Sequence, residues 1–584
     1  MSKYMILSSS APCRIRVMFF FILLLSLAAG PARGATYYLR ADGKAGKKNS
    51  ATSCASASTA MSVSTHNAAS FLPDDVICLC DGGGDYKSSI IVPSSGTKGH
   101  PIIYKNADGN KPVIDLSVDV GGLSGWTDAG GGVYRKKGAA RVLWEDNVPL
   151  RAATSTSCSD GNWYYPIGSG LLYYKPTNHT PANHTIRTMW FGDGWAPYGL
   201  DLRNRSNITV QGLSFERCGG GIGHGQNLSS PVSPISNIVL NKNTFTRCMW
   251  AIWSQIKNNG VESDVTIHGN HIDYCNSGIS AWTNSDSTPG HTQHHTRYSI
   301  TGNQILHHYS ITGSKVWSDA LLTSYYYTDH EGISFQDVQD SEISNNTISA
   351  TFDKDFTSDE YWTRAIFFYL TNGRTPTSGN LVLRNNIYGH YYPAIYITTA
   401  NGHPGFQNNI IAYNVMNYEG SYSNHGSFMT RSTSNNILNG TNFFVNNTIY
   451  NPKKGLAMEA SYHKDGNWVV RNNIFNSYGK IVIGSENDTG DFTFDHNIFS
   501  SNSGFQIGNN GMDFYSWRKK YDRVGSRVAN PLFVSPGKDF HLKPGSLAIK
   551  GGVSVGLPED FAGVRVTGKP NIGAYESQTV LRAP

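Results

Sequence analysis

Short stretches in which apolar and polar residues alternate recur along most of the chain, and this period of two predicts β-strands. Three of them, residues 207–218, 237–248 and 264–275, align without gaps. Each begins with alternating apolar residues, continues with an Asn or Gly pair, and has an apolar residue two positions later. Seven further copies follow: RYSITGNQILHH, DSEISNNTISAT, NLVLRNNIYGHY, FQNNIIAY, TNFFVNNTIYNP, NWVVRNNIFNSY and DFTFDHNIFSSN. The pattern indicates one architecture built from many similar units.

An Asn residue occupies one equivalent position in nine of the ten copies. Asn tolerates the left-handed backbone of a tight turn, and its amide can hydrogen-bond to the same residue in a neighbouring unit. The repeat therefore predicts a ladder of Asn side chains along one turn of the fold. The predicted ladder residues are Asn243, Asn270, Asn303, Asn346, Asn386, Asn409, Asn447, Asn473 and Asn497.

A second short strand that opens on a small residue follows the copies, as in GISAW, GISFQ and AIFFY. Units of two or three short strands cannot bury an apolar face alone, so they must stack, one coil upon the next. The apolar residue after the opening Gly or Ala should face the core, and its neighbours should face outward. The expected core residues are Ile252, Ile279, Ile333, Ile366, Ile395 and Leu456.

Composition agrees with an all-β chain, and the N-terminus predicts export. Aromatic residues make up 12% and charged residues 15% of the sequence, with 61 Gly. Arg14 and Arg16 precede the apolar run 17–29, and Ala32-Arg33-Gly34 offers small residues for cleavage before Ala35. We therefore expect a secreted or periplasmic monomer without a membrane span after signal cleavage. The net charge of +6 comes without a basic run, which fits an acidic polymer and does not indicate nucleic acid.

Three cysteines, Cys218, Cys248 and Cys275, occupy equivalent positions on successive repeat copies. Neighbouring coils should lie about 4.8 Å apart, so a disulfide between two of them is geometrically feasible. A stack of buried thiols is the favoured alternative. The spacing of the cysteines suits no zinc site.

Taken together, the repeat resembles the right-handed parallel β-helix of the pectate-lyase-like superfold over roughly residues 70–530. FLPDDVICLCDGGGDYKSSIIVPSSGTKGHPIIYKN is similar to the opening coils of secreted polysaccharide-active β-helices, and NPLFVSPGKDFHLKPGSLAIKGG with PNIGAYE to their terminal segment. The resemblance implies a solenoid that acts on a polysaccharide, without identifying a subfamily.

The division of the chain follows from these patterns. GGVYRKK, RVLWEDNVPLRAA, NWYYP and GLLYYK read as hairpin strands that interrupt the coils. We expect a signal peptide (1–34), an N-terminal cap with the first coils (35–120), a β-hairpin insertion (121–195), the main β-helix (196–530) and a closing segment (531–584).

Outward positions of the second strands carry aromatic residues on consecutive coils. Aromatic rings stack on the apolar faces of sugar units, so one interpretation is a sugar-binding groove. The other is that a loop or the insertion covers the rings, because large exposed apolar patches are uncommon. The predicted substrate-binding residues are Trp253, Trp282, Gln336, Tyr369, Tyr396, His425, Arg431 and Glu459.

Acidic residues concentrate in one of these coils, HEGISFQD at 330–337. Glycoside hydrolysis needs two carboxyl groups, and Glu331 and Asp337 are the leading candidates, with Arg364 one coil away as a third catalytic residue. The structural alternatives are a salt bridge between Glu331 and Arg364 and a turn-capping role for Asp337. A hydrolase of this kind requires no cofactor.

Two other functions remain open. A lyase acting on a uronate-containing polymer would use Arg364 or His425 as base, with either calcium or another neutralising group at the uronate carboxylate. GHG at 223–225 resembles a polygalacturonase motif, but the Asn-Thr-Asp and paired-Asp motifs of that family are absent, so the assignment is rejected. The third function is a non-catalytic carbohydrate-binding protein that uses the same aromatic residues.

Overall fold

The computed structural model describes most of the chain. The described residues are 34–48, 53–122, 125–140, 142–153, 155–166, 169–178, 180–189, 197–227, 231, 233–257, 259–283, 294–308, 329–350, 362–370, 375–389, 393–399, 405–417, 426–432, 440–451, 456–461, 467–477, 480–483, 492–501, 503–522 and 524–576. Residues 1–33 of the predicted signal peptide and His425 lie outside these ranges.

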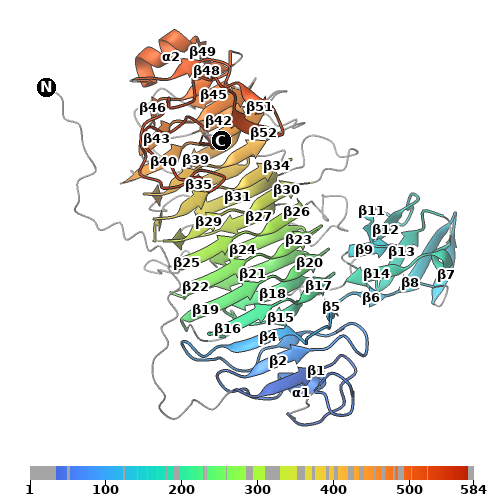
Figure 1. Ribbon diagram of the computed structural model, residues 1–584. Helices are drawn as coiled ribbons and strands as arrows, with labels where there is room; N and C mark the ends of the chain where they lie inside the picture. Colours follow the sequence, from blue (N-terminus) through green and yellow to red (C-terminus); the bar gives the residue numbers. More distant parts are fainter. Residues whose placement is uncertain are drawn as a thin grey trace, which may run out of the picture.

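Three long parallel sheets, called A, B and C, run the length of the molecule and wind into a right-handed parallel β-helix (Figure 1). Sheet A extends from β1 (Thr36–Leu39) to β46 (Phe492–Asp495), and sheet B from β5 (Val113–Asp115) to β50 (Arg527–Val528). The predicted fold class is confirmed. Sheet C carries the second strands of the repeat: β3 (Ile90–Ile91), β15 (Tyr198–Asp201), β18 (Gly220–Gly225), β21 (Trp250–Ile256), β24 (Ser277–Thr283), β27 (Asp329–Phe335), β31 (Trp362–Leu370), β35 (Ile395–Thr399), β39 (Gly426–Ser432), β42 (Leu456–Ser461), β45 (Lys480–Ile483), β48 (Gly504–Ile507) and the antiparallel β49 (Asn510–Met512).

Apolar side chains of the three sheets fill the solenoid interior as continuous stacks. The stack in sheet C runs from Ile252 through Ile279, Ile333 and Ile366 to Ile395, each opposite the next in register and fully buried. Its next members are Phe428 and Met458, so the expectation of Leu456 at this position was wrong by two residues. Leu456 pairs instead with Gly426.

An Asn ladder is present, with two corrections to its members. Each amide Nδ2 up to Asn473 donates to the Asn Oδ1 of the next coil and to a main-chain carbonyl; Asn346, for example, donates to Asn385 at 3.0 Å and Ile300 at 2.9 Å. Asn497 ends the ladder and donates to Ser526 Oγ. Asn385 and Asn414 take the places expected for Asn386 and Asn409. Asn409 belongs to a second ladder, formed with Asn380 and Asn442. The main ladder is Asn243, Asn270, Asn303, Asn346, Asn385, Asn414, Asn447, Asn473 and Asn497.

The cysteines form one disulfide and a thiol stack. Cys54 and Cys80 are bridged in the N-terminal coils. Cys218, Cys248 and Cys275 are free and buried on successive coils, which confirms the favoured interpretation. Burial raises the pKa of the Cys218 and Cys275 thiols well above the usual value.

A small β insertion stands out from the side of the solenoid between sheets B and C (Figure 1, teal). Its strands run from β6 (Val118–Asp119) to β14 (Ile186–Met189) and form two sheets, which pack around a core that includes Trp126, Trp163 and Tyr174. The first sheet contains β10 (Val148–Pro149), β9 (Val142–Glu145), β14 and β6; the second contains β11 (Arg151–Ala152), β12 (Asn162–Tyr164), β13 (Leu171–Lys175), β8 (Val133–Lys137) and β7 (Trp126–Gly130).

Helices occur near the two ends of the solenoid. α1 (Val63–Asn67) lies by the first coils, and α2 (Phe514–Tyr521) places Trp517 and Tyr521 on the end of the core. Asp513 precedes α2 as its N-cap, and its carboxylate accepts from the Ser516 amide. No helix among the described residues has the length and apolarity that crossing a membrane requires.

Candidate functional site

The outward side chains of sheet C form two parallel rows, because every second residue of each strand faces away from the core. The inner row contains Trp253, Ser280, Ser334, Phe367, Tyr396, Met429 and Glu459, which oppose one another strand by strand. The outer row contains Trp282 on β24, and Tyr369, Thr398 and Arg431 on β31, β35 and β39. We call these two rows together the sheet C face. The predicted outward alternation is therefore observed.

The insertion covers the N-terminal end of the sheet C face. Val142 and Trp144 from β9 and Met189 from β14 pack in one cluster with Trp250 and Trp253 of β21, and Trp253 is only 4% exposed. Of the two interpretations of the aromatic residues, coverage by the insertion is the one that holds for Trp253.

Beyond Trp253 the rings continue as a run of stacked and tilted contacts that advances from β21 to β35 and includes one step along β31. Trp282 stacks on Trp253 with ring centroids 5.7 Å apart, and Tyr369 lies 6.3 Å from Trp282. Phe367 follows at 5.8 Å from Tyr369 and 5.3 Å from Tyr396. Phe367 and Tyr396 are buried, whereas Trp282 and Tyr369 are half-buried. Trp282 and Tyr369 are therefore the aromatic members of the face that a ligand can reach.

Two serines make room for the Trp282 indole. Ser280 and Ser334 occupy the inner row where neighbouring coils carry Trp253 and Phe367. The Trp282 Nε1 donates to Ser334 Oγ at 3.1 Å, and Ser334 Oγ donates to Ser280 Oγ at 3.0 Å. The GIS sequence of both coils thus gives a small, hydrogen-bonding floor under one indole.

Glu331 and Arg364 form a buried ion pair beside this run of rings. They oppose each other on β27 and β31, the Arg364 Nη1 lies 3.1 Å from Glu331 Oε1, and the side chains are 2% and 3% exposed. The Arg364 guanidinium carbon also lies 4.0 Å from the Phe367 ring centroid and 5.1 Å from that of Tyr396. The salt bridge expected as the structural alternative for Glu331 is present. An adjacent guanidinium favours the ionised form of a carboxyl group, which suits a base or a nucleophile.

Asp337 and Gln336 lie at the turn that follows β27. The Thr283 hydroxyl donates to Asp337 Oδ2 at 2.8 Å and lies 3.2 Å from Gln336 Oε1, which also accepts from the Thr283 amide at 3.1 Å. Both side chains are buried, and Asp337 has a φ of 50°. These contacts are those of a turn residue, the alternative considered for Asp337; its catalytic role stays a prediction.

Charged groups reach the surface at the C-terminal part of the face. Arg431 is exposed on β39, opposite Thr398 of β35. Glu459 is half-buried on β42 and follows Tyr396 and Met429 in the inner row. The face therefore combines half-buried rings, one buried carboxylate and two further charges.

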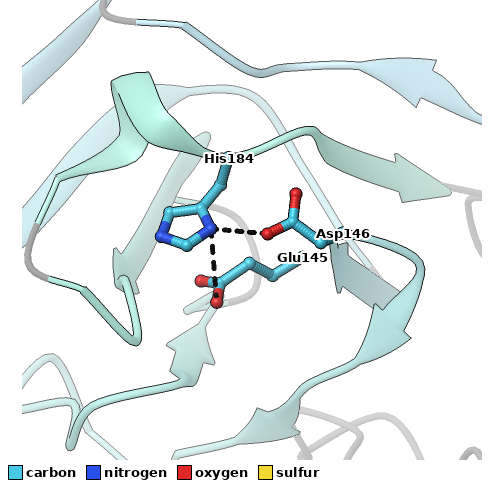
Figure 2. A group of neighbouring side chains, drawn as sticks. All are labelled: Glu145, Asp146 and His184. Atoms are coloured by element: carbon cyan, nitrogen blue, oxygen red, sulfur yellow. Dashed lines mark hydrogen bonds and ion pairs between the residues drawn. The ribbon is translucent and has the colours of Figure 1, made fainter.

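Two polar clusters elsewhere were not predicted. In the insertion, the His184 Nδ1 lies 2.7 Å from Asp146 Oδ2 and 3.6 Å from Glu145 Oε1 (Figure 2). The three residues have the chemistry and spacing of a metal-binding group. Tyr174 and Thr177 also donate to the Glu145 carboxylate, so the cluster ties the turn after β9 to the strands around it. Glu145 and Asp146 lie about 38 residues before His184, and no sequence pattern indicates that the three side chains meet.

Inside the solenoid, His224 of the GHG sequence points into the core. Its Nδ1 lies 2.7 Å from Glu262 Oε1, and Ser254 and Tyr298 donate to the other carboxylate oxygen, Glu262 Oε2. His295 Nδ1 lies 3.3 Å from the same oxygen. His224 lies two positions after the core residue Ile222 on the same strand, so strand alternation could have predicted that its side chain faces the core. Its burial agrees with rejecting the polygalacturonase assignment.

Comparison with known proteins identifies the fold and no family. No protein-family model matches the chain, and no curated protein matches it. Among solved structures, XylC in complex with xylose is similar over 92% of this chain and 98% of its own, at 11% identity and a TM-score of 0.50. The GH136 lacto-N-biosidase from Eubacterium ramulus covers 85% of this chain, and 67% of its own length is matched, at 12% identity and a TM-score of 0.41. The pectate lyase Pel9A matches 94% of this chain and 98% of its own at 14% identity, with a TM-score of 0.37.

Proposed function

We propose that this protein is an exported, monomeric carbohydrate-active enzyme that binds a polysaccharide on the sheet C face and cleaves it by hydrolysis. The observation that carries the proposal is the run of aromatic rings beside the buried Glu331–Arg364 pair. A sugar polymer presents both apolar ring faces and hydroxyl groups, and the face offers both kinds of partner. XylC, which has the same fold, was solved with bound xylose, and this supports the same class of ligand here.

The half-buried rings are the proposed binding surface for the polysaccharide. Trp282 and Tyr369 follow each other along the axis, with their ring centroids 6.3 Å apart. Aromatic rings placed in series can stack on the apolar faces of successive sugar units. We therefore assign the chain axis of the polysaccharide to the solenoid axis.

Glu331 is the proposed catalytic carboxylate. Hydrolysis of a glycosidic bond needs one carboxylic acid to protonate the leaving oxygen and one carboxylate to activate water or attack the anomeric carbon. Pairing with Arg364 favours an ionised Glu331, so Glu331 takes the second role and Arg364 positions it. Asp337 stays the sequence-based candidate for the proton donor, although the extended β27 separates it from Glu331 by more than the roughly 10 Å that a hydrolytic carboxyl pair spans. Glu459 binds the substrate further along the face.

A second candidate function is that of a lyase acting on a uronate polymer, and Arg431 favours it. Arg431 is exposed on the same face and could neutralise a uronate carboxylate. Arg364 or His425 would remove the proton next to that carboxylate, and calcium would assist by binding it. Such an enzyme leaves an unsaturated sugar that absorbs ultraviolet light, without consuming water.

A screen of polysaccharides distinguishes these functions. Purified protein is incubated with xylan, arabinan, polygalacturonate and alginate, with and without calcium, while new reducing ends and ultraviolet absorbance are recorded. New reducing ends without absorbance identify a hydrolase, and both signals together identify a lyase. Binding without turnover, if lost in Trp282→Ala, identifies a non-catalytic binding protein.

Variants then test the residues. Glu331→Asp keeps the negative charge beside Arg364 but withdraws the carboxylate, and should lower kcat by about 100-fold or more. Glu342→Gln, which changes a carboxyl group on sheet A in β29 (Glu342–Ser344), is the matched control and should leave turnover unchanged. Unchanged turnover in both Glu331→Gln and Asp337→Asn would rule out the hydrolase assignment.

A further inference from the structure

The insertion blocks the sheet C face at one end. Trp144 and Met189 are buried against Trp250 and Trp253, the last outward residues before the accessible part of the face. Trp282 packs against the same cluster from the other side and remains half-buried. A polymer lying on Trp282 therefore meets the insertion when it is followed toward the N-terminal coils.

The outward surface of β18, the sheet C strand next to β21 on its N-terminal side, is also covered. The Tyr198 ring belongs to the same cluster and lies over the outward surface of β18, where Gly220 and Gly223 leave room for it. A Cβ atom on Gly223 would lie 2.6 Å from the ring. Gly220 and Gly223 of the sequence GGGIGHG are thus explained by a ring that occupies the place of their outward side chains.

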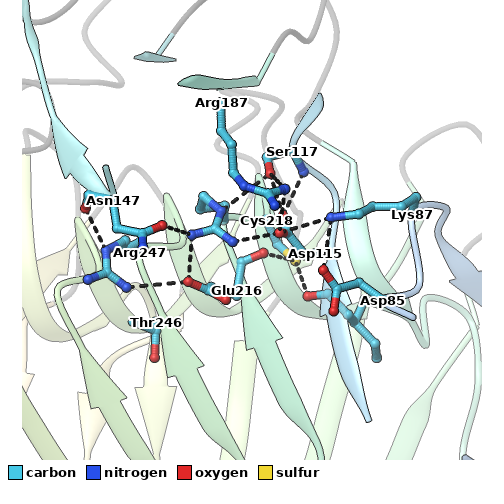
Figure 3. A network of polar contacts seen from close by, with 12 residues as sticks. Asp85, Lys87, Asp115, Ser117, Asn147, Arg187, Glu216, Cys218, Thr246 and Arg247 are labelled. Carbon is cyan, nitrogen blue, oxygen red and sulfur yellow. Dashed lines mark hydrogen bonds and ion pairs between the residues drawn. The ribbon is translucent and has the colours of Figure 1, made fainter. Parts of the chain in front are cut away.

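A buried ionic network holds the insertion in place (Figure 3). The Asp115 carboxylate of β5 is fully buried and lies 2.7 Å from Arg217 Nη2 of the solenoid and 3.4 Å from Arg187 Nη1 of the insertion. Asn147, in the turn after β9, accepts from Arg217 at 2.6 Å with its side chain and from Arg247 at 2.9 Å with its carbonyl. Moving the insertion away would remove Arg187 from Asp115 and the Asn147 acceptors from Arg217 and Arg247, although Arg217 and Lys87 would stay paired with Asp115. A buried donor that loses its acceptor costs about 1–3 kcal/mol, which favours the seated insertion.

We propose that the insertion is a fixed wall that makes the enzyme act on chain ends and not on internal bonds. This inference rests on the proposed function. Glu331 of β27 lies two strands beyond Trp253 of β21, about 10 Å along the axis. That space accepts a short terminal saccharide, and the rest of the polymer extends over Tyr369 toward β42. Trp144 and Met189 are then specificity-determining residues, and Asp115 and Arg217 are positioning residues for the wall.

Hydroxyl-radical footprinting read by mass spectrometry tests the wall without any substrate. Trp250 and Trp253 should be protected in the wild-type protein, whereas Trp282 should be oxidised. Asn147→Gly keeps the left-handed turn but removes the acceptor for Arg217, and should raise the oxidation of Trp253 several-fold. Arg135→Ala, on the other sheet of the insertion, is the matched control and should leave the footprint unchanged. Oxidation of Trp253 in the wild-type protein at the rate of Trp282 would overturn the proposal.

Dye-crosslinked insoluble polysaccharides test the consequence, because only cleavage of internal bonds releases the dye. Soluble and crosslinked forms of xylan, arabinan and polygalacturonate are compared. We expect wild-type protein to release short saccharides from a soluble polymer and no dye from its crosslinked form, and Trp144→Ala with Met189→Ala to release dye. Asn147→Gly serves the same purpose if the double variant does not fold.

The outcomes separate the two proposals. Dye release by the wild-type protein would overturn the chain-end inference and leave the proposed function standing. If none of the soluble polymers is cleaved, the proposed function is wrong and the chain-end inference falls with it.

Discussion

The Arg364 guanidinium and the Glu331 carboxylate are held 3.1 Å apart on adjacent strands of sheet C, where both are almost completely buried. Truncating either partner removes this ion pair while the other side chain stays buried. Arg364→Ala and Glu331→Ala should each lower the free energy of unfolding by about 3–5 kcal/mol, measured by urea denaturation. The double variant should cost clearly less than the sum of the single variants. Additive effects would show that the two side chains do not interact in solution.

The buried Glu262 carboxylate predicts loss of stability in acid. Burial opposes its ionisation, but His224 and His295 outweigh that effect and hold the pKa of Glu262 well below its ordinary value of 4.5. A carboxyl group whose pKa is lower in the folded state contributes stability above its unfolded pKa and loses it as the pH falls through the folded pKa. The Tm should therefore fall more steeply below about pH 4.5 in the wild-type protein than in Glu262→Gln. Parallel curves for the two proteins would contradict this.

Removing one member of the Asn ladder should be costly although no charge is involved. Asn346→Ala leaves the Ile300 carbonyl and the Asn303 amide without the partners that they have in the wild-type protein. A buried polar group without a partner costs about 1–3 kcal/mol, so the loss should be at least about 2 kcal/mol. Asn467→Ala, at an exposed position of β43 (Asn467–Arg471), is the control and should change stability by no more than about 0.5 kcal/mol. Equal denaturation midpoints for the two variants would argue against the ladder.

The free thiols should be unreactive in the folded protein. The cysteines outside the disulfide at residues 78, 158, 218, 248 and 275 are all buried, and burial raises the pKa of Cys158 to about 11. Ellman's reagent should label these thiols slowly in the native state and rapidly in denaturant. Peptide mapping without reduction should recover the Cys54–Cys80 link and no link within the Cys218–Cys248–Cys275 stack. Rapid labelling under native conditions would show that the stack opens.

The fold could be predicted because alternation and the Asn repeat are both local properties of the sequence. Ile252, Ile279 and Ile333 are fully buried as expected, and each directly follows a small residue of its strand. The errors came from how the copies were aligned. The copy NLVLRNNIYGHY starts one residue later in the repeat than the earlier ones, because its third residue, Val382, opposes Ile343, the fourth residue of DSEISNNTISAT. An alignment without gaps therefore selected Asn386 in place of Asn385.

The surroundings of the candidate site could be predicted only in part. The Glu331–Arg364 pair was foreseeable because the two residues occupy equivalent positions on successive coils. The burial of Trp253 depends on Trp144 and Met189, more than 60 residues away in a different sheet system, and no pattern around Trp253 records that contact. The roles of the site residues remain predictions for the experiments above.

The Asn ladder also sets which parts of the solenoid are free to change in length. Consecutive ladder residues are separated by as few as 24 and as many as 43 positions, yet every link is a hydrogen bond of about 3 Å. The ladder thus fixes one corner of each coil, whereas the loops at the other corners can differ in length from coil to coil. Insertions and deletions at those corners can remodel the surface above sheet C without shifting a strand, so new binding properties could arise on an unchanged scaffold.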